Sequence, residues 1–332
     1  MRTSQEGVRM IHTEGLTRHF VSKKETVEAV KGVNIDVAAG ELVAFLGPNG
    51  AGKSTTLRML TTLLPPTSGA AWVAGASITK EPAVVRSRIG YIGQGDAAGH
   101  SFRVMDELVM QGRFYGMNSS DSLARARDLT KTLDLTSLEK RKVSTLSGGQ
   151  RRRLDIAIGL MHSPGLLFLD EPSTGMDPHN RANLWEHIDE LRERQETTIV
   201  LTTHYLEEAD SHAERVLVID HGEIIANDTA ANLKATLAGD RIVVTVDGAD
   251  LAAASAVVAA RGSELTTSNG SREVTIAGRF DHGTRTLPWL LRELDHAGVE
   301  VRAADVRVPT LDDVFLSLTG RSLREDVEEV AK

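Results

Sequence analysis

Cysteine is absent from all 332 positions of the sequence. Disulfide bonds, thiolate metal ligands and cysteine nucleophiles are therefore excluded. The absence is consistent with a reducing compartment.

Long apolar runs are also missing. The longest candidate, residues 251–260, is short, consists of small residues and includes Ser255, whereas a membrane-spanning helix needs about eighteen apolar residues or more. Residues 1–6 lead into mixed polar sequence without the apolar segment of a secretory signal. We therefore expect a chain that does not cross a membrane by itself.

An excess of positive charge is lacking as well. The formal net charge is −8 and the isoelectric point is near 5.8, which argues against a nucleic-acid-binding body. The run Arg151-Arg152-Arg153 is the exception, and we expect it to form a solvated face or salt bridges. The apolar content of 41% is that of an ordinary globular protein, and the length suffices for two domains.

A phosphate-binding pattern, G-x-x-x-x-G-K-[S/T], occupies residues 47–54. It follows the apolar run Leu42–Leu46 and precedes an expected helix at 55–60, which is the strand–loop–helix context that the pattern requires. Its backbone N–H groups and the helix N-terminus are suited to an anion. The expected nucleotide-contacting residues are Gly47, Pro48, Asn49, Gly50, Ala51, Gly52, Lys53, Ser54 and Thr55. Lys53 would reach the β- and γ-phosphates, and Ser54 would ligate Mg²⁺.

The elements around this pattern predict a mostly parallel, covered sheet preceded by an antiparallel layer. Short extended runs between residues 8 and 46 form the layer, with Phe20 in a loop where its ring could stack on adenine or simply pack in the core. Residues 96–162 are charged and helical in period, so we expect a helical insertion with helices at 103–115 and 122–133. A strand at 165–171 that ends in two carboxylates, a helix at 182–194, a strand at 198–202 and a hairpin at 215–226 follow.

The composition changes near Gly239, where we expect a second unit. Its predicted order is strand 241–246, helix 251–260, strand 264–267, strand 273–276, helix 284–297 and strand 299–308, the split βαβ arrangement of ferredoxin-like domains. A helix at 310–318 closes it. The predicted organisation is a nucleotide-binding domain at 1–238, an accessory α+β domain at 239–320, and a mobile charged tail at 321–332.

Two further stretches point to the chemistry of this site. Leu146-Ser147-Gly148-Gly149-Gln150 opens a helix, so its N–H groups and hydroxyl form a second anion site. Asp170 closes a buried strand where its carboxylate would orient Mg²⁺ through water. Glu171, directed elsewhere by strand alternation, would polarise the attacking water as a general base.

These motifs, in this order over about residues 8–230, resemble the ATP-binding subunit of an ABC transporter. The resemblance implies the ABC cassette version of the P-loop NTPase fold, and hydrolysis of ATP with Mg²⁺. By position, Phe20 is similar to the adenine-stacking aromatic, and Gln94 to the glutamine that touches Mg²⁺ or attacking water and senses the membrane partner. His204 is similar to the switch histidine near the γ-phosphate, and residues 173–177, ending at Asp177, to the loop that communicates between two ATP sites.

In that family two copies close head to tail over two ATP molecules. The resemblance therefore implies an ATP-dependent homodimer in which each nucleotide meets the phosphate loop of one copy and residues of the other. The second copy's expected contacts are Ser147, Gly148, Gly149, Gln150 and Asp177.

A narrower resemblance concerns residues 170–178, 202–210 and 311–320. They are similar to ATPase subunits of the daunorubicin/doxorubicin-resistance type. This chain departs from the usual pattern at Met176, which replaces a leucine. The resemblance implies separate membrane subunits of the ABC-2 exporter type and a location at the cytoplasmic face of the cell membrane. A cluster after Gln94 would either receive that partner or pack internally: Phe102, Met105, Met110, Phe114, Tyr115 and Met117.

Other functions stay open at this point. Related ATPases serve exporters of lipids, oligosaccharides or cations. A soluble ABC ATPase of DNA repair or translation would need coiled-coil heptads or a second phosphate loop, and the sequence has neither. A regulatory module that does not hydrolyse ATP is disfavoured because Glu171 and His204 are both present.

Overall fold

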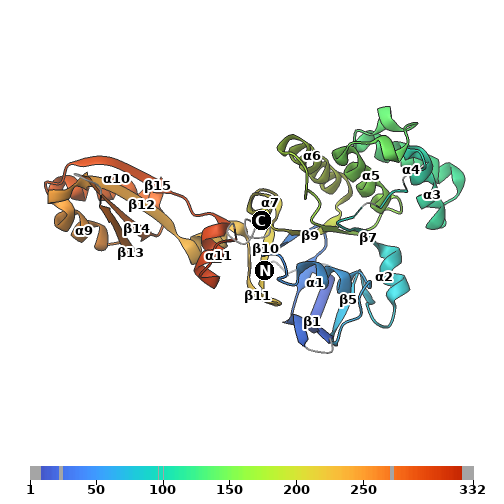
Figure 1. Ribbon diagram of the computed structural model, residues 1–332, viewed down its shortest axis with the longest axis horizontal. Helices are drawn as coiled ribbons and strands as arrows, with labels where there is room; N and C mark the ends of the chain where they lie inside the picture. The colour runs from blue at the N-terminus through green and yellow to red at the C-terminus, as the bar shows by residue number, and fades with distance from the viewer. Residues whose placement is uncertain (1–8, 22–24, 96, 100, 270–272, 324–332) are drawn as a thin grey trace, which may run out of the picture. The chain divides into compact units, whose positions relative to one another are not determined.

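The computed structural model describes residues 9–21, 25–95, 97–99, 101–269 and 273–323. The chain divides into two compact units, residues 1–227 and 228–332, and Figure 1 shows the elements of each. Among the described residues, no helix combines the length and the apolar character that a bilayer span requires.

The first unit is organised around a six-stranded sheet. Its strands, in spatial order, are β11 (Glu223–Asp228), β10 (Arg215–Asp220), β4 (Leu42–Leu46), β9 (Thr198–Thr203), β8 (Leu166–Asp170) and β7 (Ile89–Ile92). The five strands from β10 to β7 pair in parallel. Every residue of β4, β8 and β9 is buried, which explains why these strands are mostly apolar. The predicted mostly parallel sheet is confirmed.

Helices connect these strands. They are α1 (Lys53–Leu60), α2 (Pro82–Arg88), α3 (Val104–Phe114), α4 (Ser119–Thr132), α5 (Gly148–Leu160), α6 (Pro178–Gln195) and α7 (Leu206–His212). Short 3-10 turns lie at Thr136–Leu138 and Val143–Thr145. Figure 1 shows α3, α4 and α5 grouped on the side of the sheet away from β1 and β5, so the expected helical insertion is confirmed.

An antiparallel sheet forms the second layer of this unit. It comprises β1 (Arg9–Val21), β2 (Thr26–Val33), β3 (Asp36–Ala38), β5 (Ser68–Val73) and β6 (Ala76–Ser77). The sequence placed Phe20 in a loop, and this was wrong: Phe20 lies in β1 opposite Val27 of β2. The first half of β1 pairs with β3 and β5, and its second half pairs with β2. β1 therefore continues to Val21. Val8, where the first strand was expected to begin, lies outside the described residues.

The second unit contains a four-stranded antiparallel sheet in the order β13 (Ser263–Asn269), β14 (Glu273–Phe280), β12 (Asp240–Asp247), β15 (Val301–Arg307). Two helices, α9 (Leu251–Ala259) and α10 (Gly283–His296), complete the βαββαβ order. The ferredoxin-like arrangement is therefore confirmed; β12, β13 and β14 are longer than expected, and β15 is shorter. Helix α8 (Ala230–Leu233), a π-helical turn at Lys234–Ala238, a 3-10 turn at Gly248–Asp250 and helix α11 (Leu311–Thr319) complete the list. Residues 324–332 of the expected tail lie outside the described residues.

Candidate nucleotide-binding site

The phosphate loop joins β4 to α1 and depends on glycine for its shape. Gly52 stands at the N-cap of α1 with φ of 105°, a left-handed conformation that strains any residue with a Cβ. A Cβ on Gly52 would also lie 2.4 Å from the carbonyl oxygen of Ala29. The loop borders a cavity of about 170 Å³, here called the Lys53 cavity, together with Gln94 and Glu171.

Lys53 is folded back onto this loop. Its side chain is only 4% exposed, and its Nζ donates to the carbonyl oxygens of Gly47 at 2.7 Å and Pro48 at 3.0 Å. Burial lowers the pKa of Lys53, while the nearby carboxylates of Glu171 and Asp170 oppose that shift. The ammonium group is thus bonded to neutral carbonyl oxygens. A charged phosphate would bind it more strongly and could replace them.

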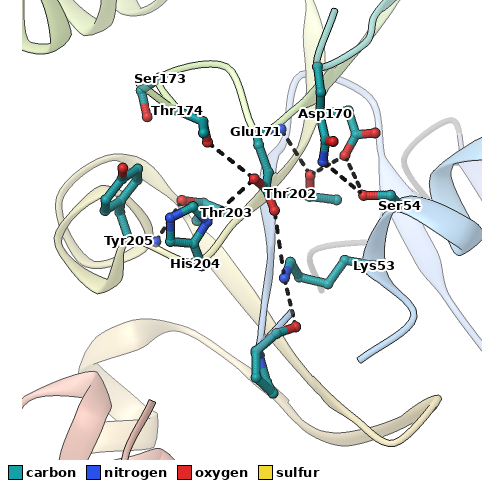
Figure 2. A network of polar contacts seen from close by, with 12 residues as sticks. Lys53, Ser54, Asp170, Glu171, Ser173, Thr174, Thr202, Thr203, His204 and Tyr205 are labelled. Carbon is teal, nitrogen blue, oxygen red and sulfur yellow. Dashed lines mark hydrogen bonds and ion pairs between the residues drawn. The ribbon is translucent and has the colours of Figure 1, made fainter. Parts of the chain in front are cut away.

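Asp170 is the centre of a second set of polar contacts, drawn in Figure 2. Its Oδ1 accepts hydrogen bonds from Ser54 Oγ and from Thr202 Oγ1, both at 2.7 Å. Gln94 Nε2 lies 3.4 Å from Ser54 Oγ, and Tyr91 donates to Asp170 Oδ2 at 3.5 Å. Ser54, Gln94 and Asp170, the three expected metal-site residues, therefore meet at one point.

This donor set suits Mg²⁺ bound together with a nucleotide. The described residues contain no cluster of three or more His, Cys, Asp or Glu side chains that could hold a metal by themselves. One carboxylate, one hydroxyl and one amide are instead gathered beside the phosphate loop. Mg²⁺ in phosphoryl-transfer sites uses few protein ligands, because waters and substrate phosphates supply the rest.

Glu171 and His204 form an ion-pair contact at the edge of the Lys53 cavity. His204 Nδ1 lies 3.4 Å from Glu171 Oε2, which also accepts from Thr174 Oγ1 at 3.1 Å. Glu171 Oε1 lies 3.9 Å from Lys53 Nζ. The contact with His204 is the main reason that the pKa of Glu171 is lowered, and the charge of Lys53 adds to it. Glu171 is therefore an ionised carboxylate near neutral pH, as a general base must be.

The direction of the Glu171 side chain has a different cause from the expected one. β8 ends at Asp170, so strand alternation does not extend to Glu171. Its backbone is left-handed, with φ of 48°, and its N–H is held by the carbonyl oxygen of Thr202 at 3.1 Å and by Thr202 Oγ1 at 3.0 Å. β9 thereby fixes the turn that aims Glu171.

Ser147 caps helix α5. Its Oγ accepts from Gln150 N at 3.3 Å, and Gln150 Oε1 accepts from Ser147 N at 3.0 Å, which is a capping box. Gln150, expected to contact nucleotide, has its side-chain oxygen engaged in this cap. A side chain at Gly149 would displace Asn180, since a Cβ would lie 2.8 Å from Asn180 Oδ1.

Ser147, Gly148 and Gly149 border a cavity of about 480 Å³, here called the Ser147 cavity. Asp177 borders it too and caps α6, with Oδ1 accepting from Asn180 N at 3.0 Å; this hydrogen bond lowers the pKa of Asp177. Gln94 and Glu171 border both cavities. Within one chain, however, Ser147 and Lys53 line different cavities.

Phe20 stands apart from both cavities. Its ring is 41% exposed, with the Arg18 guanidinium 4.7 Å from the ring centroid. Its strand partner Val27 belongs to β2, and Ala29 of β2 approaches Gly52 of the phosphate loop. The ring is therefore on a strand neighbouring the loop, with an exposed face.

Several residues of the site escaped the sequence interpretation. Thr202 bonds to both Asp170 and Glu171, and its signal was a hydroxyl at the end of an otherwise apolar strand. Arg152 was expected in a solvated face or salt bridge, but it is buried. It donates to the carbonyl oxygens of Gly93 at 2.6 Å and Pro172 at 2.8 Å. Arg153 fits the salt-bridge alternative, with its Nη1 3.2 Å from Asp134 Oδ2.

Comparison with known proteins agrees with this geometry. The family model described as ABC transporter matches residues 30–174. The chain is 40% identical to a daunorubicin resistance ATP-binding protein of Streptomyces coeruleorubidus, over 97% of this chain and 98% of that protein. It is 35% identical to a linearmycin resistance ATP-binding protein of Bacillus subtilis, over 95% and 100%.

A solved structure shares the fold of the first unit. It is a dimeric ATP-binding cassette in a post-hydrolysis state bound to ADP and phosphate, with a TM-score of 0.61, 25% identity, and coverage of 66% of this chain and 98% of that one. The expected P-loop NTPase cassette fold is confirmed. The chain belongs to the ATP-binding, ATP-hydrolysing subunits of ABC exporters, in the group of the daunorubicin/doxorubicin resistance ATP-binding proteins.

Proposed function

We propose that this chain uses Mg²⁺ and ATP to power the efflux of a drug-like or other amphipathic compound through separate ABC-2 type membrane subunits. The observation that carries the proposal is the convergence of Lys53, Glu171 and His204 beside the Ser54–Asp170 pair.

Each side chain has a distinct task in this mechanism. Lys53 exchanges the carbonyls of Gly47 and Pro48 for the β- and γ-phosphates, where its charge offsets the charge of the transition state. Glu171, held ionised, accepts the proton of the attacking water. His204 orients that carboxylate and would lie near the γ-phosphate of bound ATP.

Ser54, Asp170 and Gln94 are the proposed Mg²⁺ residues. Bound there, the ion would neutralise charge on the β- and γ-phosphates. Ser54 would ligate it directly with Oγ, and Asp170 would hold ligating water through Oδ1. Thr202 keeps Asp170 in place from the far side.

The functional unit that we propose is a head-to-tail homodimer with two ATP molecules. Its support is the separation of Ser147 and Lys53 into different cavities within one chain. Ser147, Gly148, Gly149, Gln150 and Asp177 of one copy would then close on ATP held at the phosphate loop of the other, while Phe20 stacks on adenine. The similar cassette bound to ADP and phosphate is itself dimeric.

The membrane partner is expected on the helical insertion. Phe102, Phe114 and Tyr115 are exposed there, at 49%, 77% and 41%, and Gln94 precedes them. A methionine- and aromatic-rich surface adapts to an inserted helix. We propose that this contact holds the chain at the cytoplasmic face of the cell membrane, with domains 1–238 and 239–320 having separate roles.

The cargo is proposed from the names of the relatives, which refer to daunorubicin and linearmycin resistance. A second candidate is export of an oligosaccharide-based compound, because a relative 37% identical over 89% of this chain is a Nod factor export ATP-binding protein. Lipid and cation exporters are further alternatives.

The test is to isolate the native complex from membranes and to measure which compounds raise its ATP hydrolysis. Stimulation by an amphipathic drug, abolished by Glu171→Gln, is the expected result. Stimulation by an oligosaccharide conjugate alone would favour the second candidate. Absence of any membrane protein from the isolated complex would contradict the exporter role.

A further inference from the structure

Glu208 is a buried carboxylate that the proposed mechanism does not use. It lies in α7 and is 3% exposed. Burying a carboxylate is costly unless hydrogen bonds and an opposite charge compensate it. Its partners therefore indicate what it contributes.

Each oxygen of Glu208 binds a different hydroxyl. Oε1 accepts from Ser173 Oγ, and Oε2 accepts from Thr203 Oγ1 at 2.7 Å. Arg181 Nε lies 3.8 Å from Oε1 and supplies the opposite charge. Ser173 and Thr203 are themselves buried, so without Glu208 their hydroxyls would lose these partners.

The two hydroxyls belong to the two segments that carry the proposed catalytic pair. Ser173 stands two residues after Glu171, and Thr203 directly precedes His204. Thr203 Oγ1 also accepts from Tyr205 N at 2.9 Å. The residue before His204 is therefore hydrogen-bonded to the residue after it. Figure 2 shows Ser173 beyond Thr174 on the segment of Glu171, and Thr203 beside His204.

We propose that Glu208 is a positioning residue for ATP hydrolysis. Its carboxylate clamps the segment of Glu171 to the segment of His204, and so holds His204 Nδ1 against Glu171 Oε2. A carboxylate suits this task because it accepts from both hydroxyls at once. The inference rests on the proposed roles of Glu171 and His204.

The test is a double-mutant cycle in the full-length chain, with Glu208→Ala, His204→Ala and the two combined. We expect Glu208→Ala to lower kcat by about tenfold or more, since small misplacements of reacting groups cost that much. Binding of a fluorescent ATP analogue should change less than about twofold, because Glu208 borders neither cavity. In the Glu208→Ala background, His204→Ala should add little further loss, because the histidine is already displaced.

Two variants keep the test decisive if Glu208→Ala folds poorly. Thr203→Val retains the shape of the side chain but removes the link between Glu208 and the His204 segment, so it should show the same coupling to His204→Ala. Thr198→Val is the matched control: it is buried on the same strand and accepts from Gly40 N at 2.9 Å, yet kcat should be preserved.

Glu208→Gln should retain much of the activity. Its amide oxygen can accept from Thr203, and its amide can donate to Ser173, whose hydroxyl is free to turn. Independent, multiplicative losses from Glu208→Ala and His204→Ala would overturn the inference, as would unchanged kcat in both Glu208→Ala and Thr203→Val. If His204→Ala alone leaves kcat unchanged, the proposed role of His204 fails first, and the positioning role fails with it.

Discussion

Ser54 Oγ donates a hydrogen bond to Asp170 Oδ1 at 2.7 Å, although the two residues are 116 positions apart. Ser54 is in the first turn of α1, and Asp170 is the last residue of β8. The carboxyl ends of parallel strands meet at one edge of a sheet, where ligands bind in open α/β folds. This contact therefore marks the point where nucleotide and cation are expected.

Replacing Lys53 with alanine should abolish most ATP turnover. Among the described residues, Lys53 is the only lysine that borders the Lys53 cavity. Loss of one such charge-stabilising donor costs roughly 100- to 1000-fold in kcat. Phosphate release by the purified chain is the measurement. Lys80→Ala, at an exposed position, is the control, and turnover by Lys53→Ala at the level of this control would refute the role of Lys53.

Glu171→Gln should bind ATP but hydrolyse it at least about 100-fold more slowly, because an amide cannot accept the proton of water. ATP that is not consumed keeps holding two copies together, so the variant should accumulate as a dimer. Light scattering with and without ATP measures this. Glu207→Gln, at an exposed position of α7, should behave like the wild type. A Glu171→Gln chain that stays monomeric in saturating ATP would contradict the proposed dimer.

Thr202→Val tests a residue that only the structure identified. The change removes the hydroxyl that donates to Asp170 and accepts from Glu171 N, while the size of the side chain is kept. Losing hydrogen bonds of this kind should lower kcat about three- to tenfold and raise the Mg²⁺ concentration needed for half-maximal activity. Steady-state kinetics across a Mg²⁺ titration would show it, and an unchanged Mg²⁺ dependence would mean that Thr202 does not hold the cation site.

The sequence was sufficient for the elements whose pattern has a local cause. The phosphate loop was identified because glycine spacing and a buried strand stand next to each other at residues 42–54, and the parallel core strands because each is a short apolar run. The ferredoxin-like order of the second unit also followed from local patterns. Residues 68–92, by contrast, were not assigned, although they form β5, β6, α2 and β7.

What escaped prediction depends on contacts between distant segments. The left-handed turn at Glu171 is held by Thr202 of a neighbouring strand. Arg152 is buried because the carbonyls of Gly93 and Pro172, from two other segments, accept from it. A charged residue in a helix has no local signal of such partners, so the sequence suggested only a solvated face or salt bridges. The same reason concealed Glu208.

The stability of the chain should depend on pH through Glu171. Its pKa in the folded chain is lowered below the ordinary 4.5, mainly by the contact with His204. A carboxyl with a lowered pKa contributes stability that is present above its unfolded pKa and is lost as pH falls through its folded pKa. The free energy of unfolding of the wild type minus that of Glu171→Gln should therefore be largest above pH 4.5 and decrease below it.

Urea unfolding of both chains over about pH 3 to 7 measures this difference. In a His204→Ala background the main cause of the lowered pKa is absent, so the pH-dependent part of the difference should shrink. A difference that grows as the pH falls would show that the folded state raises the pKa of Glu171 instead.

Removing residues 229–332 should spare nucleotide binding. The compact unit that ends at Asn227 contains the phosphate loop, Asp170, Glu171 and His204, and the cut after Asp228 keeps β11 whole. The residues bordering the Lys53 cavity all lie in the retained part, so the Kd for a fluorescent ATP analogue should stay within about threefold of the full-length value. Circular dichroism controls for the fold, and Lys53→Ala in the shortened chain controls for specific binding. A shortened chain that is folded but no longer binds the analogue would show that the second unit supports the nucleotide site, and the proposed division of roles would have to be abandoned.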